Sequence, residues 1–250
     1  MSGASVLRSS WLGRVEYLDG WRLQEAVATR VRAGADERLL LLEHDPVYTI
    51  GRRGTTDHLL AGPSELHRAD ASVYRVDRGG DITFHGPGQL VGYPVVRLGD
   101  AFDVVSYVRA IEGALIDALA SYRVAARAER GKTGVWVYLP ETGAPAKIAA
   151  IGVRVSRGVT THGFALNVRT DLTAFERMIP CGFAHEVASL ERLGVSAQTQ
   201  DVGARTAAAL ADRLGRALSW SSVEPARDDE IAADSPVRSA VDLIRETVAV

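Results

Sequence analysis

The chain has 250 residues, of which 46% are hydrophobic and 24% charged, so it is long enough to bury a full core and short enough to be one domain. Its formal charge of −2 gives no overall attraction to nucleic acid or to anionic lipid. The apolar runs have the length of strands and fall short of the ~18 residues that span a bilayer. The single cysteine, Cys181, cannot form an internal disulfide, which is typical of a reducing compartment. We therefore expect a cytoplasmic protein with no nucleic-acid partner and no membrane partner.

Hydrophobic periodicity and turn residues divide the chain into helices and strands. In chain order, the pattern predicts a helix over 21–32, strands over 38–43, 73–76, 82–85 and 90–96, a helix over 103–122, strands over 135–139, 147–155 and 163–168, and a helix over 199–218. The connections between strands are mostly short and rich in Gly or Pro, which predicts an antiparallel or mixed sheet flanked by helices rather than a Rossmann fold.

Three further expectations concern single positions and the chain ends. Asp103 is placed to cap the helix that follows it, and Pro94 is expected to put its strand at a sheet edge or a bulge. Polar composition predicts disorder over 1–10 and 224–234. We expect a single domain over 1–220 and a tail over 221–250 whose role the sequence does not assign.

Glycines are concentrated between Arg78 and Gln89, in the sequence RGGDITFHGPGQ. Such density around one strand indicates that the backbone turns sharply or closely approaches another group. A pair of ordinary hairpin turns around Ile82–Phe84 explains the spacing equally well. The segment does not match a phosphate-binding loop or a dinucleotide-binding motif, because those require a helix directly after the glycines.

A second group of small residues follows Lys147, one of only two lysines among 29 basic residues. Lysine can lose its proton where arginine cannot, so Lys147 is a candidate catalytic residue, although an ordinary strand-terminal lysine with its head in water is the alternative. The small residues either leave room for an apolar ligand or permit close packing of the backbone; they are Ala149, Ala150, Gly152, Gly163 and Ala165.

Cys181 stands between Pro180 and Gly182, a pattern typical of a tight turn. A glycine there would let backbone N–H groups face a developing oxyanion, which suits a nucleophile, whereas a buried inert thiol is the alternative. The six histidines show no metal-ligand spacing, so no metal is expected. His85 and His162 adjoin the glycine-rich segments and are either site residues or structural histidines.

Taken together and in this order, the segments Arg78–Gln89, Lys147–Gly152, His162–Val168 and Pro180–Gly182 resemble the lipoyl(octanoyl) transferase family of lipoate biosynthesis. The resemblance extends from about Leu39 to about Leu190. It implies an α+β fold like that of biotin and lipoyl protein ligases, a mixed, largely antiparallel sheet flanked by helices. It also implies an octanoyl-[acyl-carrier-protein]:protein N-octanoyltransferase without a cofactor. The donor would be octanoyl-acyl carrier protein, and the acceptors would be lipoyl domains of 2-oxoacid dehydrogenases and the glycine cleavage H protein.

The resemblance further assigns roles to individual residues. A cysteine matching Cys181 takes the octanoyl group as a thioester, and a lysine matching Lys147 lowers the thiol pKa and can carry a proton. The chain departs from the family pattern at Phe183 and Ala188, just past the nucleophile. The family's acyl-substrate pocket maps onto three segments: Arg78, Gly79, Gly80, Asp81, Ile82, Thr83, Phe84 and His85; Ala150, Ile151 and Gly152; and Gly163, Phe164 and Ala165.

Arginines in or near these segments are expected to form a basic rim that attracts an acidic carrier protein; they are Arg52, Arg53, Arg75, Arg78, Arg154 and Arg157. Three other functions remain open on the sequence alone. An ATP-dependent lipoate or biotin ligase would share the fold but would need no cysteine. A non-catalytic acyl-binding protein would have no use for the Cys181–Lys147 pair, and a cysteine hydrolase would release the acyl group to water.

Overall fold

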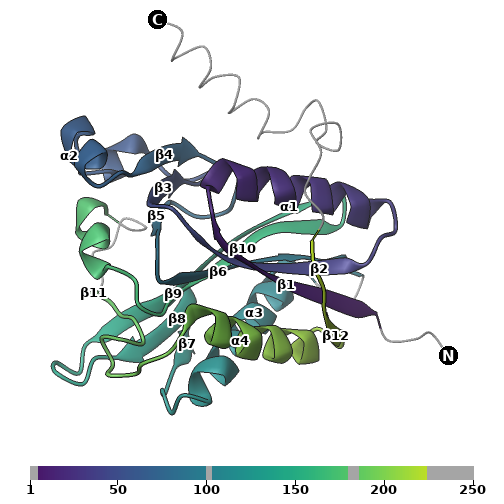
Figure 1. Ribbon diagram of the computed structural model, residues 1–250. Helices are drawn as coiled ribbons and strands as arrows, with labels where there is room; N and C mark the ends of the chain where they lie inside the picture. The colour runs from purple at the N-terminus through teal and green to yellow at the C-terminus, as the bar shows by residue number, and fades with distance from the viewer. Residues whose placement is uncertain (1–4, 100–102, 180–185, 224–250) are drawn as a thin grey trace, which may run out of the picture.

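The computed structural model describes residues 5–99, 103–179 and 186–223 (Figure 1). Its main sheet has the strand order β12-β1-β2-β6-β10-β9-β8-β7, and β11 pairs with β9. The strands are β1 (Val6–Val15), β2 (Glu37–His44), β6 (Gln89–Val95), β7 (Arg127–Glu129), β8 (Lys132–Tyr138), β9 (Pro145–Ser156), β10 (Val159–Asn167), β11 (Glu186–Val187) and β12 (Ala217–Trp220). A second sheet has the order β4-β3-β5, from β3 (Val47–Ile50), β4 (Ser72–Arg75) and β5 (Ile82–His85).

The main sheet is mixed, as expected. β1 runs parallel to both of its neighbours, whereas β2, β6, β10, β9, β8 and β7 pair in antiparallel fashion. β9 and β10 form a hairpin with a two-residue connection, Arg157 and Gly158, and both adopt positive φ angles of 52° and 74°. Two consecutive positive φ angles give a connection whose twist matches that of the flanking strands.

Helices cover both faces of the main sheet (Figure 1). On one face lie α3 (Val104–Ala120), which begins where the Asp103 side chain accepts a hydrogen bond from the Ser106 N–H, and α4 (Thr199–Arg213). On the other face lie α1 (Tyr17–Arg32) and, beside it, the small sheet. The short helices are η1 (Thr56–His58), α2 (Pro63–Arg68) and η2 (Leu172–Arg177). Within the described ranges, no helix combines the length and apolar character needed to cross a membrane.

The strand β2 is covered on both of its faces, which accounts for its uninterrupted run of leucines. Leu39 and Leu41 pack with the buried residues of α3 and α4, while Leu40 and Leu42 pack with Val27 and other residues of α1. Because successive side chains of a strand point to opposite faces, a strand buried on both sides is apolar at every position. The apolar run therefore places β2 in the interior of the sheet.

Two expectations about local structure are wrong. Val6–Ser10 belongs to β1, and Ser9 and Ser10 are buried in the sheet, so their polarity does not indicate disorder. The last helix stops at Arg213, because Gly215 adopts a positive φ of 65° and Leu218 belongs to β12.

Of the two alternatives expected for Pro94, a sheet edge or a bulge, the structure excludes the edge. β6 lies between β2 and β10, and its pairing with β10 covers Gln89 to Gly92 and stops before the proline. A local interruption of the ladder thus accommodates the missing N–H. The segment 224–234 and the tail from 224 onward lie outside the described residues, so the division at 220 stays a prediction.

Candidate functional site

The loop from Arg78 to Asp81 joins the small sheet to the main sheet. Backbone hydrogen bonds from Gly51, Arg52 and Arg53 to the carbonyl groups of residues 78, 80 and 81 hold the loop on one side, at 3.1 Å each. On the other side, the Gly79 N–H donates to the Val153 carbonyl of β9 at 3.0 Å. The first and second predicted site segments are therefore in direct contact.

Arg78 helps to fix this loop. Its side chain is buried, and its guanidinium donates to the carbonyl and hydroxyl oxygens of Thr49 at 2.7 Å and 2.9 Å and to the Gly79 carbonyl at 3.0 Å. A guanidinium hydrogen-bonded to neutral oxygens keeps its positive charge inside the fold. Arg78 thus brings a buried cation to the predicted acyl-binding segment rather than an exposed charge to a rim.

Gly152 and Gly163 lie directly opposite each other in the β9–β10 pair and allow close approach of the backbone. A Cβ at Gly152 would lie 2.8 Å from the Gly79 oxygen, and one at Gly163 would lie 2.1 Å from the Gly92 oxygen. Both distances are shorter than real Cβ contacts. Of the two alternatives that the sequence left open for these glycines, the structure supports close packing.

We expect Gly163→Val to lower the free energy of unfolding by about 3 kcal/mol or more, because its side chain would overlap backbone atoms of β6. Thermal or urea denaturation would measure the loss. Gly99→Val is the control, since nothing lies within 4 Å of a Cβ at Gly99. A Gly163→Val protein of normal stability that rejects only long acyl chains would instead show that the glycine makes room for a ligand.

The three predicted segments share one face of the main sheet only in part. Ala165 packs in the core on the α1 side, whereas Phe164 and Ile151 pack toward α3 and α4. By strand alternation, Ala150, Gly152 and Gly163 lie on the α1 side with Ala165. Phe164 and Ile151 therefore belong to the opposite core and support the site from behind.

The strand β5 divides in the same way. Ile82 and Phe84 pack in a small core with Tyr48 and with Ala174 and Met178 around η2. His85 lies outside this core and stacks on Tyr17 of α1, with ring centroids 6.2 Å apart and planes at 9°. Only part of the predicted segment 78–85 thus faces the main sheet.

A β-bulge sets the direction of Lys147. In the β8–β9 pair, Val135 lies opposite Ala149 and Trp136 lies opposite Lys147, so β9 carries one extra residue there. Ile148 and Ala149 both belong to the core under α3 and α4. With regular alternation, Lys147 and Ala150 would lie on opposite faces of the sheet. Because of the bulge, Lys147 lies on the same face as Ala150 and Gly152.

Lys147 is held between an aromatic ring and a short strand. Its Nζ lies 4.8 Å from the centroid of the Trp136 ring, within the range of a cation–π contact. β11 runs parallel to β9 with Val187 opposite Lys147, and the Ala188 N–H donates to the Lys147 carbonyl at 3.0 Å. The chain that follows the predicted nucleophile is thus anchored beside this lysine.

The chain before the predicted nucleophile also reaches the site. The Ile179 N–H donates to the His58 carbonyl at 2.8 Å, and His58 Nδ1 lies 2.6 Å from Asp81 Oδ2. Cys181, its neighbours and the departure at Phe183 lie outside the described residues. Ile179 is therefore bonded to the residue that contacts Asp81, and Val187 and Ala188 lie beside Lys147; Asp81 and Lys147 are both predicted site residues.

Four charged or titratable groups connect the loop to α1. Asp77 contacts His162 Nε2 and an Arg154 nitrogen, each at 2.7 Å, and the same Arg154 nitrogen lies 3.4 Å from Glu25. Burial alone would raise the pKa of Asp77. The hydrogen bond and charge of His162, together with the charge of Arg154, outweigh burial, so the pKa of Asp77 is lowered overall. Burial and the nearby Asp77 raise the pKa of Glu25. His162 adopts a positive φ of 57°, a conformation that these contacts hold in place.

Two buried imidazoles lie beside this group. Burial lowers the pKa of His85 to about 3, with the charge of His44 adding to the effect, and burial lowers the pKa of His44 to about 4. His44 Nε2 lies 2.7 Å from the Tyr93 hydroxyl, and His85 Nδ1 lies 2.7 Å from Gln89 Oε1. Both rings are therefore neutral at physiological pH.

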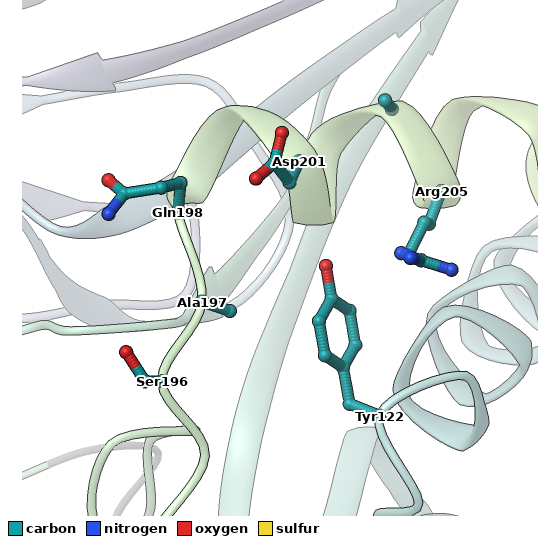
Figure 2. Close-up of a pocket in the computed structure, with 7 residues that line it drawn as sticks. Tyr122, Ser196, Ala197, Gln198, Asp201 and Arg205 are labelled. Atoms are coloured by element: carbon teal, nitrogen blue, oxygen red, sulfur yellow. The ribbon is translucent and has the colours of Figure 1, made fainter.

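Surface depressions elsewhere on the molecule do not coincide with these residues. One lies between the end of α3 and the start of α4, where Tyr122 and Arg205 face each other with 5.0 Å between the guanidinium carbon and the ring centroid (Figure 2). Another is lined by Arg32, Arg97 and Arg157 at the tip of the β9–β10 hairpin. Neither is lined by a residue of the predicted acyl-binding segments.

Sequence reasoning missed several residues that the structure places in the site. Thr49 binds Arg78, His58 binds Asp81, and Asn167 accepts a hydrogen bond from Gln89 at 2.9 Å. His58 stands in a stretch whose neighbours give no signal, and Thr49 lies within the resemblance without a role of its own. Gln89 and Asn167 lie at the ends of segments that were singled out, but no role was assigned to them.

The chain resembles known proteins over most of its length. The family model described as the lipoyl protein ligase A/B catalytic domain matches residues 16–211. An octanoyltransferase from Solibacter usitatus is 49% identical over 196 residues, which cover 78% of this chain and 86% of that protein. An octanoyltransferase from Mycobacterium leprae is 49% identical over 216 residues, covering 84% and 90%.

Solved structures show the same fold at much lower identity. Lipoate-protein ligase A bound with ATP superimposes with a TM-score of 0.75 at 17% identity, covering 95% of this chain and 94% of that chain. A bipartite lipoate protein ligase from Thermoplasma acidophilum gives 0.73 at 17% identity, covering 95% and 92%. The expected fold is confirmed by these superpositions, and by the extent of its family match the chain belongs to the lipoyl protein ligase A/B catalytic domain family, in its octanoyltransferase group.

Proposed function

We propose that this chain transfers an octanoyl group from octanoyl-acyl carrier protein to a lysine of lipoyl domains in the cytoplasm, through a thioester on Cys181. The acceptors are the lipoyl domains of 2-oxoacid dehydrogenases and the glycine cleavage H protein. One observation carries the proposal: octanoyltransferases are 49% identical over most of this chain. Ile179 is bonded to His58, the partner of Asp81, and Val187 pairs with Lys147; these contacts on either side of Cys181 in the sequence support the assignment of the nucleophile.

The reaction has two acyl transfers. Cys181 Sγ attacks the thioester carbonyl of the donor, and the pantetheine thiolate leaves and takes up a proton. The ε-amine of the acceptor lysine then attacks the acyl-enzyme, loses a proton, and displaces the Cys181 thiolate. Lys147 serves both steps: its ammonium form stabilises the thiolate, and its neutral form accepts the proton of the incoming amine.

The direct test is incubation of the purified protein with octanoyl-acyl carrier protein and an apo lipoyl domain, with and without ATP. Octanoylation of the lipoyl domain without ATP is expected. Activity only with free octanoate and ATP would indicate a ligase, and release of octanoate would indicate a hydrolase. Binding without turnover would indicate an acyl-binding protein.

The basic rim expected from the sequence is narrower in the structure. Arg78 is buried, and Arg154 pairs with Asp77 and Glu25, whereas Arg52, Arg53 and Arg75 are exposed near the glycine-rich loop. Arg157 is also exposed, but it lies at the tip of the β9–β10 hairpin. We propose that this exposed trio receives the acidic carrier protein.

Reversing two of these charges, Arg52→Glu with Arg53→Glu, should raise the KM for octanoyl-acyl carrier protein about 10-fold and weaken its salt dependence. The rate with a small octanoyl thioester should change little. Arg123→Glu with Arg130→Glu is the matched control, because these exposed arginines lie beyond α3, near β7. Equal losses with both donors would place Arg52 and Arg53 in the reaction itself.

A further inference from the structure

A chain of hydrogen bonds runs through the interior from His85 to the strand of Lys147. His85 Nδ1 lies 2.7 Å from Gln89 Oε1, Gln89 Nε2 donates to Asn167 Oδ1 at 2.9 Å, and Asn167 Nδ2 donates to the Ala188 carbonyl at 3.0 Å. The Ala188 N–H in turn donates to the Lys147 carbonyl. The first three side chains are buried, with 7%, 2% and 5% of their surface exposed.

Two backbone carbonyls fix the direction of every bond in this chain, since a carbonyl only accepts. The Ala188 carbonyl requires Nδ2 of Asn167, which turns Oδ1 of Asn167 toward Gln89. Gln89 must then donate through Nε2, and the Phe84 carbonyl, 3.1 Å from the same nitrogen, requires this as well. Oε1 of Gln89 is left to face His85, so Nδ1 of His85 carries the proton.

The consequence concerns the other ring nitrogen. A neutral imidazole protonated on Nδ1 has a lone pair on Nε2 and can only accept there. Burial keeps the pKa of His85 at about 3, so the ring stays in this form at physiological pH. Among the described residues, no hydrogen bond reaches Nε2 of His85, and the side chain keeps a small exposed fraction.

We propose that Gln89 and Asn167 are positioning residues that hold His85 protonated at Nδ1, so that its Nε2 accepts a hydrogen bond from the ε-amine of the acceptor lysine. The inference rests on the proposed function. The octanoyl tail offers no N–H donor, whereas the attacking amine does. A neutral ring also avoids the repulsion that an imidazolium would exert on a lysine ammonium as it enters.

The tautomer can be observed without any substrate. In ¹⁵N NMR spectra of the full chain, His85 should show a protonated Nδ1 and an unprotonated Nε2, with the signals assigned by their loss in His85→Phe. Gln89→Leu removes the acceptor at Nδ1 and should move the proton to Nε2. Gln24→Leu is the matched control: Gln24 is also buried and accepts the His162 N–H at 2.6 Å, but it lies outside this chain of bonds. It should keep the wild-type tautomer.

Kinetics of the separate half-reactions test the role of the amine. In Gln89→Leu, transfer from the acyl-enzyme to the lipoyl domain should slow about 10- to 100-fold, the effect of one lost hydrogen bond to a charged or reacting group. Acylation by octanoyl-acyl carrier protein should stay within about 3-fold of the rate in Gln24→Leu, which corrects for any general loss of stability.

Three results would overturn the proposal. A proton that remains on Nδ1 in Gln89→Leu would show that Gln89 does not set the tautomer. If Gln89→Leu transfers the octanoyl group to the lipoyl domain at the normal rate, Nε2 of His85 does not receive the amine. If its acylation by octanoyl-acyl carrier protein slows equally, Nε2 binds an amide of the pantetheine arm instead. A wild-type protein that transfers no octanoyl group would overturn the proposed function, and with it the acceptor-lysine amine as the hydrogen-bond donor to Nε2. The NMR spectra would still report the tautomer of His85 in that case.

Discussion

Cys181→Ala should abolish octanoyl transfer, with the rate falling by a factor of at least about 10³, because the covalent route loses its nucleophile. Intact-mass spectrometry of the wild-type protein after brief exposure to octanoyl-acyl carrier protein should show one octanoyl-sized addition that hydroxylamine removes. The alanine variant should show none. The wild-type chain has a single cysteine, so the variant contains no thiol at all and any remaining addition would have to sit on another nucleophile.

Cys181→Ser separates the nucleophile from the shape of its surroundings, because a hydroxyl replaces the thiol with little change in size. Its transfer rate should also collapse, since an alcohol far from its pKa is a weak nucleophile without a dedicated base. An alanine variant that transfers at the normal rate would contradict the thioester mechanism. The chain would then be a scaffold on which donor and acceptor react directly.

Much of the fold follows from local signals in the sequence. The sequence predicts β5 at 82–85, β9 and β10 within a few residues of their observed bounds, and the cap of α3 at Asp103. These elements have strong alternation, a turn residue at each end, or a capping side chain whose hydrogen bond forms locally. Such features depend little on the rest of the chain.

The errors arise where long-range contacts decide the structure. β1 contains buried serines whose environment comes from the strands on either side, β2 and β12. The helical period of Leu210 and Leu214 continues to Leu218, but the backbone of Gly215 breaks it. Periodicity records which residues are apolar and cannot show where the backbone changes direction.

The sequence predicts which segments form the candidate site but does not predict how their residues are arranged in space. The sequence draws attention to the glycines, but only the structure shows that Gly152 accommodates the Gly79 carbonyl. The bulge that brings Lys147 onto the face of Ala150 depends on pairing with β8, so strand alternation within β9 alone gives the wrong face. Residue types identify the chemistry, and cross-strand register decides which residues meet.

The largest remaining effect is expected from Lys147→Arg, which keeps the positive charge and removes a group that can act as a base near neutral pH. Alkylation of Cys181 by iodoacetamide should stay fast in Lys147→Arg and slow in Lys147→Ala, if the charge lowers the thiol pKa. Lys132→Arg is the matched control. The chain has only two lysines, and the Lys132 Nζ lies 5.2 Å from the same Trp136 ring.

The two half-reactions then separate charge from proton transfer. Lys147→Arg should acquire the octanoyl group at nearly the wild-type rate but pass it to the lipoyl domain about 10²–10⁴-fold more slowly, because nothing accepts the proton of the attacking amine. Rapid-quench mass spectrometry would follow both steps. If Lys147→Arg completes the second step at the wild-type rate, charge alone accounts for this lysine; if Lys147→Ala does so as well, Lys147 has no part in the mechanism. The bulge and the Trp136 ring fix the position of the amine, so a loss confined to the second step would identify Lys147 as the base.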